Sequence, residues 1–183
     1  MKGVVFERPG HVSVSSDLER PVATSPGEAV VRVTLASVCG SDLHPFRGDE
    51  PGLDPGTVMG HEFVGRIVEL QPEAKHSGAD HNGIDSSNPR DGGRSIDDEK
   101  LSDLRVGDLV CSPFTTCCLA CEPCKSGLTS RCVSGALFGW RSGGKGLHGG
   151  QAEYVLVPMA RTTLVRIDEP GNTAGEGRTC VHG

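Results

Sequence analysis

The sequence has no long hydrophobic run, few aromatic residues and no excess of basic charge. Its apolar runs fall short of the roughly 20 residues that a membrane-spanning helix needs, and the run at residues 1–6 is too short for a secretory signal. The formal net charge is −6 and aromatic residues make up 4% of the chain. Proteins that bind nucleic acids or anionic membrane surfaces need clusters of Lys and Arg. We therefore expect a cytoplasmic protein whose partner is neither a nucleic acid nor a membrane.

Glycine and proline, in contrast, are abundant: 26 and 12 of 183 residues. They separate short runs of β-branched residues, a pattern typical of a β-rich domain with many turns. We predict one helical turn at 41–46 and strands at residues 1–6, 11–14, 28–37, 63–70, 109–111, 151–157 and 163–167. In the third strand Val31, Val33 and Leu35 should share one face, because alternate side chains point to opposite sides of a strand.

Two segments differ from the rest of the chain. Residues 71–102 are rich in Ser, Asn, Asp and Gly and poor in apolar side chains, so they cannot bury enough surface to offset the entropy lost on ordering. We predict a disordered insertion there, between two strands. Residues 168–183 show no periodicity, and we expect an irregular tail. Residues 1–167 should otherwise form one domain.

Four cysteines within fifteen residues form the most specific motif: Cys118, Cys121, Cys124 and Cys132, spaced Cys-x2-Cys-x2-Cys-x7-Cys. Disulfide bonds are the alternative, but bridges among cysteines this close in sequence would be strained or would close very small loops. Without a secretory signal, thiols stay reduced and bind metal. Four thiolates form a closed tetrahedral zinc shell. We therefore predict a structural zinc lobe at residues 111–135.

A second group of potential ligands comprises Cys39 and His61, each next to the end of a predicted strand, together with Glu62. Taken singly, Cys39 could be a small buried hydrophobic residue and His61 an ordinary histidine at a strand start. Together the first two supply two ligands, and Glu62 is either a third ligand or a partner of one. Three protein ligands with one open position are typical of a catalytic zinc site.

Residues close to Cys39 are suited to support that chemistry. The Ser41 hydroxyl can pass a proton on, and the His44 imidazole titrates near neutral pH, so the pair could carry a proton away. Asp42 could orient a ligand histidine through a hydrogen bond.

The chain resembles the N-terminal, GroES-like catalytic domain of the zinc-dependent medium-chain alcohol dehydrogenases. The resemblance rests on Cys-Gly-Ser-Asp-Leu-His at 39–44, Gly-His-Glu-Phe-Val-Gly at 60–65, the four-cysteine lobe, Val-Gly-Asp-Leu-Val at 106–110 and Gly-Gly-Gln-Ala-Glu-Tyr at 149–154. It covers residues 1–167 apart from the insertion, and its last motif is similar to that of the formaldehyde dehydrogenase and related microbial or fungal branches. It implies a mainly β fold, a partly open GroES-like barrel with a zinc-binding lobe and few short helices.

The resemblance also implies roles for the residues in these motifs. Cys39 and His61 would bind a catalytic zinc, Glu62 would lie beside it as a transient ligand, and Ser41 and His44 would match the proton relay. The lobe cysteines Cys118, Cys121, Cys124 and Cys132 would bind a structural zinc. Cys111 and Cys117 fall outside the pattern and are interpreted as non-ligands, although Cys117 could compete with Cys118.

The sequence departs from the family in two respects. It contains no strand–GxGxxG–helix unit of the kind that binds NAD or NADP, and residues 143–146, Gly-Gly-Lys-Gly, are interpreted as a loop. Cys180 lies near the distance expected for a third zinc ligand, but its neighbours do not match the family.

We therefore interpret the chain as a truncated catalytic domain of an alcohol or aldehyde dehydrogenase-like oxidoreductase, acting on a small alcohol or aldehyde. The alternative is a non-enzymatic zinc-binding remnant that forms oligomers with itself or with full-length relatives. A zinc-ribbon module for nucleic acid or protein is a third class, against which the acidic charge counts.

We expect this chain alone to show little or no NAD(P)-dependent alcohol oxidation. The hydride acceptor must be held at contact distance from the substrate. The sequence contains no motif of the kind that binds the nicotinamide nucleotide and would hold it there. Steady-state assays of nicotinamide reduction check this, and turnover at an ordinary enzyme rate would contradict it.

Overall fold

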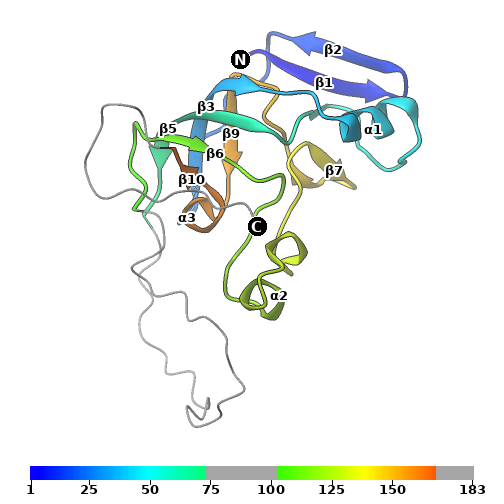
Figure 1. Cartoon of the computed structure of the whole chain (residues 1–183). Helices are drawn as coiled ribbons and strands as arrows, with labels where there is room; N and C mark the ends of the chain where they lie inside the picture. The colour runs from blue at the N-terminus through cyan, green and yellow to red at the C-terminus, as the bar shows by residue number, and fades with distance from the viewer. Residues whose placement is uncertain (73–102, 168–183) are drawn as a thin grey trace.

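The computed structural model describes residues 1–72 and 103–167. The predicted insertion beyond Pro72, the predicted tail and Cys180 lie outside the described residues. Most of the described chain forms short strands with a few helical turns between them, as Figure 1 shows. The predicted mainly β fold is thus confirmed for this part of the chain.

The largest sheet has five strands in the order β10-β6-β5-β3-β9, and all of its pairs are antiparallel. Its strands are β3 (Ala29–Ala36), β5 (Phe63–Leu70), β6 (Leu109–Cys111), β9 (Tyr154–Val157) and β10 (Val165–Arg166). The predicted bounds of β5 and β6 are therefore correct. The prediction for residues 163–167 is wrong at its start, because Thr163 ends a helix, α3 (Ala160–Thr163).

A second sheet, in the order β2-β1-β4, lies beside the first (Figure 1). It consists of β1 (Gly3–Arg8), β2 (His11–Ser15) and β4 (Thr57–Val58). An isolated bridge between Gly3 and Ala152 connects its central strand to the segment that enters β9. This connection places residues near the start of the chain against residues near 150.

The predicted helical turn at 41–46 exists as a 3₁₀ turn, η1 (Gly40–Asp42), followed by α1 (Leu43–Arg47). The helix ends at Gly48, whose φ of 81° lies in the left-handed region that favours glycine. Two further turns, α2 (Glu122–Lys125) and η3 (Thr129–Arg131), lie in the projecting lobe that carries the label α2 in Figure 1. Within the described residues, no helix has the length and hydropathy of a membrane span.

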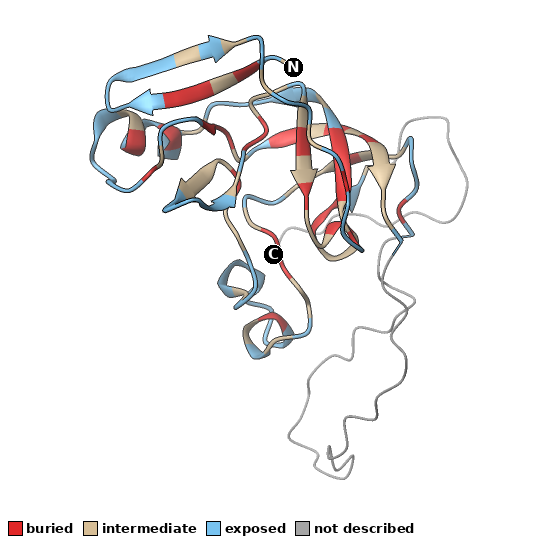
Figure 2. Ribbon diagram, turned by 180° about the vertical axis from the view of Figure 1, so that it is seen from behind, coloured by how far each residue is buried: buried red, intermediate tan, exposed pale blue. Residues whose placement is uncertain are grey.

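The main core lies against the five-stranded sheet. Phe63 and Phe138 meet edge to face with ring centroids 5.2 Å apart, a geometry that aromatic pairs favour. The red segments in Figure 2 follow these strands, whereas much of the lobe is pale blue. The fully enclosed core side chains, each no more than 2% exposed, include Ala29, Val31, Ile67, Leu104, Val110, Val155 and Val157.

The predicted alternation of β3 fails at Leu35. Its pairing with β5 slips by one residue, because Val33 lies opposite Gly65 while Leu35 lies opposite Val64, which leaves Thr34 as an extra residue. An extra residue of this kind is a β-bulge, and it reverses the face of every side chain that follows. Leu35 is accordingly 69% exposed while Val31 is fully buried, so the expectation that the two share one face is wrong.

The glycine-rich segment 143–146 is not merely a loop. Trp140–Ser142 (β7) and Lys145–Leu147 (β8) form a hairpin around Gly143 and Gly144. These two glycines have φ of 58° and 76°, as a tight two-residue hairpin turn requires. The interpretation as a loop is therefore wrong for the last two residues, which belong to a strand.

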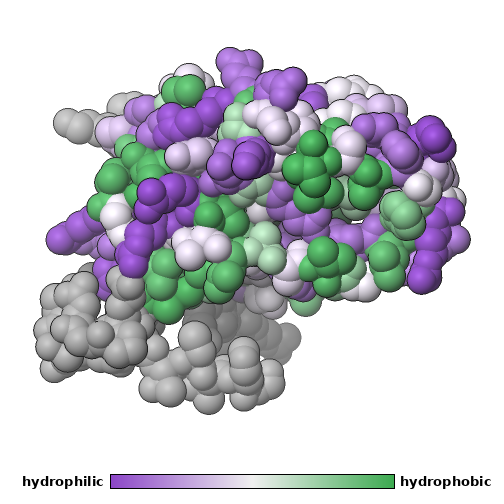
Figure 3. Space-filling model, turned by 90° about the horizontal axis from the view of Figure 1, so that it is seen from above, coloured by the Kyte–Doolittle hydropathy of each residue, from purple (hydrophilic) through white to green (hydrophobic). Residues whose placement is uncertain are grey.

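Several apolar side chains stay at the surface. Leu35 and Val38 are 69% and 73% exposed on one side of the molecule, and Val14 of β2 is 72% exposed. In the view from above, hydrophobic groups in green alternate with polar groups in purple (Figure 3). This face therefore presents both apolar and polar groups to its surroundings.

We expect the substitution Ile67→Ala to lower the free energy of unfolding by about 2–5 kcal/mol, because it leaves a cavity under β5 where the side chain is only 1% exposed. The matched control is Val14→Ala on the exposed strand β2, which should change stability by less than about 0.5 kcal/mol. Denaturant unfolding of both variants measures this, and equal losses would contradict the core assignment.

Candidate metal centres

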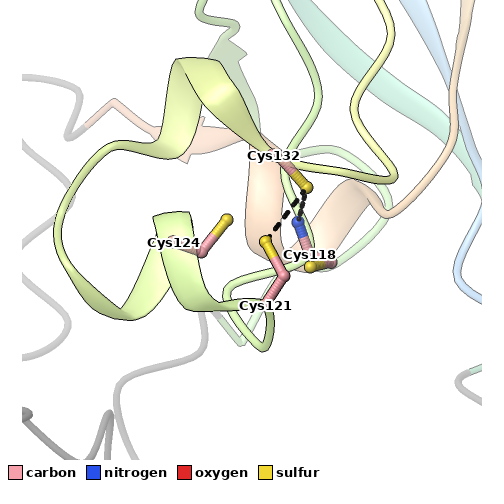
Figure 4. A group of neighbouring side chains, drawn as sticks. All are labelled: Cys118, Cys121, Cys124 and Cys132. Atoms are coloured by element: carbon pink, nitrogen blue, oxygen red, sulfur yellow. Dashed lines mark hydrogen bonds between the residues drawn. The ribbon is translucent and has the colours of Figure 1, made fainter.

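The four lobe cysteines converge on a common point. Their sulfur atoms all lie within 4.8 Å of one another, and Figure 4 shows the side chains directed inward from different turns. Cys121 immediately precedes α2, Cys124 lies within it and Cys132 follows η3. Leu119, with a φ of 53°, reverses the chain between the first two ligands. The turns of the lobe thus gather ligands that a strand would have spread apart.

The chemistry of this donor set fits a zinc ion. None of the four cysteines is in a disulfide. Backbone N–H groups directed at the sulfurs lower the pKa of Cys118, and lower that of Cys121 to about 6. Burial raises the pKa of Cys124 to about 12, so this thiol needs a bound cation to lose its proton. Four converging sulfurs form the closed tetrahedral shell typical of structural zinc sites.

The neighbouring Cys117 is oriented away from this cluster. Its sulfur donates a hydrogen bond to the carbonyl oxygen of Thr162 at 3.0 Å, and the Thr162 hydroxyl donates back to the carbonyl of Cys117 at 2.5 Å. Burial raises the pKa of the Cys117 thiol. Neither Cys117 nor Cys111, which lies in β6, is part of the converging group.

The structure also brings Cys39, His61 and Glu62 together, with their ligand atoms within 4.8 Å of one another. Cys39 precedes η1, whereas His61 and Glu62 precede β5. The Ser37 hydroxyl donates a hydrogen bond to the Glu62 carboxylate. One sulfur, one imidazole nitrogen and one carboxylate oxygen are a donor set that fits a zinc ion with a position open for a further ligand.

Asp42 and Ser41 contact the imidazole of His61 from either side. Asp42 Oδ1 lies 3.4 Å from His61 Nδ1, and its other oxygen accepts a hydrogen bond from the Cys39 N–H at 2.9 Å. Ser41 Oγ lies 3.2 Å from His61 Nε2 and 3.4 Å from the sulfur of Cys39. The Asp42 side chain is only 9% exposed, so these contacts also stabilise a nearly buried carboxylate.

His44 is not brought into this group. Its ring lies on α1, 57% exposed, with Nδ1 3.9 Å from Asp49 Oδ2. No hydrogen bond joins it to Ser41 among the described residues. The two residues that the sequence pairs in a proton relay thus lie on consecutive turns without a direct hydrogen bond between them in the described structure.

A hollow of about 440 Å³ opens beside Cys39, Ser41 and His61. Its lining also includes five apolar or aromatic residues: Met59, Phe114, Leu137, Phe138 and Trp140. An apolar hollow with a few convergent polar groups is the usual form of a small-molecule site.

The fold agrees with comparison to known proteins. The model of the alcohol dehydrogenase GroES-like domain family matches residues 25–82 and 93–169. The chain belongs to this family. The resemblance deduced from the motifs is thereby confirmed at the family level.

The relatives of this GroES-like domain include enzymes of several kinds. It is 39% identical over 168 residues to the medium chain reductase/dehydrogenase ucsI of Acremonium sp., covering 91% of this chain and 46% of that protein. It is 39% identical to zinc-type alcohol dehydrogenase B of Aspergillus flavus, covering 92% of this chain and 32% of that protein. The chain thus spans less than half the length of these relatives.

Among solved structures, the alcohol dehydrogenase TADH from Thermus sp. ATN1 superposes with a TM-score of 0.71 at 32% identity, covering 92% of this chain and 40% of that one. This likeness confirms the predicted GroES-like architecture.

Sequence reasoning missed two residues near the second cluster, Ser37 and Gln151. The Ser37 hydroxyl bonds Glu62, and the Gln151 amide donates to Asp42 Oδ2 at 3.2 Å. Gln151 lies in the motif at 149–154, which by itself indicates only a strand. The only signal in the sequence was that Gln151 is a polar residue between two glycines and a strand.

Metal analysis of the purified, reduced protein should give close to two zinc ions per chain. Cys118→Ser should remove one of them, because it breaks a four-sulfur shell. Cys117→Ser is the matched control and should keep both, because that sulfur bonds a carbonyl instead. Loss of a zinc from the control and not from Cys118→Ser would contradict the ligand assignment.

Proposed function

We propose that this chain is the zinc-binding catalytic domain of an alcohol or aldehyde dehydrogenase-like oxidoreductase, with little activity on its own. One observation carries the proposal: Cys39, His61 and Glu62 converge beside an apolar hollow, at a place separate from the four-cysteine lobe. A closed sulfur shell has no position for a substrate, whereas a three-ligand group beside a hollow does. The two centres therefore have different tasks.

Cys39 and His61 would hold the catalytic ion, and Glu62 would be either a third ligand or a group that approaches it transiently. A zinc ion bound there supplies a Lewis acid that polarises a substrate oxygen and lowers the pKa of a bound alcohol. Glu62 is exposed and receives the hydrogen bond of Ser37, so its carboxylate is held near the other two ligands.

Ser41 is the residue best placed to accept a proton from a substrate hydroxyl in the hollow, because it lines the hollow and contacts both Cys39 and His61. His44 would receive the proton nearer to solvent, on the next turn. Since the two side chains are not hydrogen-bonded, this step requires a bridging group, such as water or a hydroxyl of the cofactor or substrate.

The walls of the hollow favour a small alcohol or aldehyde with an apolar body. Phe114, Leu137 and Trp140 offer apolar surface, and Cys39, Ser41 and His61 line the same hollow. The hydride acceptor would be NAD or NADP, which this chain is not expected to bind well by itself. The similarity to the glutathione-independent formaldehyde dehydrogenase of Pseudomonas aeruginosa, 32% over 177 residues, supports the proposed branch.

The proposal also includes association with copies of this chain or with other family members. Exposed apolar side chains such as Leu35 and Val38 lie close in sequence to Cys39, and covering them would remove apolar surface from water.

The test is to load the protein with Co²⁺ and add imidazole or a small alcohol. We expect the Co²⁺ absorption spectrum to change, because the second centre has an exchangeable position, and Cys39→Ser to abolish this change while keeping the metal in the lobe. A single metal per chain, or a spectrum that no added ligand alters, would sink the catalytic proposal and favour a zinc-binding domain without catalysis. Titration with NADH, followed by its fluorescence, measures the expected weak cofactor binding.

A further inference from the structure

Gln151 lies where the segment after the β7–β8 hairpin enters β9, and its backbone is fixed on both sides. Its N–H donates to the carbonyl of Met59 at 2.9 Å, and its own carbonyl accepts from the N–H of Val4 at 2.8 Å. These bonds tie it to the segment after β4 and to β1. The side chain therefore starts from a well-determined position.

The side chain of Gln151 reaches across to the candidate catalytic centre. Its Nε2 donates one hydrogen bond to the carbonyl of Ser37 at 3.1 Å and another to Oδ2 of Asp42 at 3.2 Å. A primary amide has two N–H donors, so both are used. The amide thus bridges the chain after β3 and the 3₁₀ turn η1.

The carboxylate that receives this bond is held at both oxygens. Oδ2 of Asp42 also accepts the Cys39 N–H at 2.9 Å, while Oδ1 lies 3.4 Å from Nδ1 of His61. The rotation of the carboxylate about its terminal bond determines whether Oδ1 faces the imidazole. Because Gln151 contributes one of the two bonds to Oδ2, it helps to fix this rotation.

Gly60 leaves the room that the side chain of Gln151 needs. A Cβ at position 60 would lie 2.4 Å from the Cγ of Gln151, and the φ of Gly60 is 91°. The residue before His61 thus lacks a side chain where the glutamine stem passes. This arrangement joins the placement of Gln151 to the start of the segment that carries the ligand.

We propose that Gln151 is a positioning residue of the second metal centre: its amide orients Asp42, and Asp42 in turn orients His61 and the backbone at Cys39 for metal binding. This inference rests on the proposed function, because it concerns the same Cys39–His61–Glu62 centre. Outer hydrogen-bond partners of metal ligands commonly change metal affinity by about 10–100-fold.

The test compares Gln151→Met with wild-type protein in a zinc competition titration against a chromophoric chelator. Methionine matches the length of glutamine and retains packing against Gly60, but it has no donor. We expect a loss of at least about tenfold in affinity at the second centre, as is usual for such partners. The zinc in the four-cysteine lobe should be unaffected.

The matched control is Gln71→Met. The Gln71 amide also donates to a backbone carbonyl, that of Ala23 at 2.7 Å, but it does not contact the centre. We expect this variant to keep the wild-type affinity at both centres, whatever its melting temperature.

A role of Gln151 in stability alone would mean that Gln151→Met lowers the melting temperature without changing the zinc affinity. That result would overturn the inference.

A second variant covers the case in which Gln151→Met does not fold. Gln151→Asn retains the amide, but it is one methylene shorter and should not reach Asp42, so it should show the same loss of affinity and an altered Co²⁺ spectrum at the second centre. Wild-type affinity in this variant would contradict the proposal.

Failure of the inference and failure of the proposed function are distinguishable. If wild-type protein binds two metals and both Gln151 variants bind them equally well, the positioning role is refuted and the function stands. If wild-type protein has no second metal, both fall.

Discussion

The backbones at Gly139 and Gly149 both approach the backbone at Gly60 without side chains between them, and the candidate catalytic centre depends on these contacts. A Cβ at Gly149 would lie 2.1 Å from the carbonyl oxygen of Gly60, and one at Gly139 would lie 2.8 Å from its nitrogen. Only glycine allows backbones to approach this closely. These contacts bring together His61, which follows Gly60, Trp140 of the hollow, which follows Gly139, and the segment that enters β9.

The two metal centres differ because their ligands come from different kinds of structure. The lobe gathers four sulfurs within one continuous segment, where short turns can aim them at a common point without help from the rest of the domain. The second centre takes Cys39 and His61 from segments next to two neighbouring strands, β3 and β5. Its geometry is therefore set by the sheet and by hydrogen bonds such as that of Asp42 to the Cys39 N–H. Its three potential ligands are also of three different types, and they line a hollow.

The same difference explains how much could be predicted from the sequence. The four-cysteine spacing is local, so the convergence of Cys118 and Cys132 followed from the sequence alone, as did the bounds of β5. Leu35 was misplaced because a bulge depends on how two strands pair, and a single-strand pattern contains no such information. Gln151 was overlooked because its partners lie more than a hundred residues away, at Ser37 and Asp42.

The lobe has a consequence for the hollow, although a closed four-sulfur shell would leave a metal there no open position for a substrate. Its two ends are held together by hydrogen bonds from Thr116 N–H to the Ala136 carbonyl at 3.0 Å and from Phe138 N–H to the Phe114 carbonyl at 3.1 Å. Phe114 and Phe138 also line the hollow beside Cys39. A metal that closes the lobe restricts the motion of its ends, and those ends form the apolar wall that a substrate would contact. In the proposed function, the closed centre would therefore fix the shape of a surface, while the open centre would contribute the chemistry.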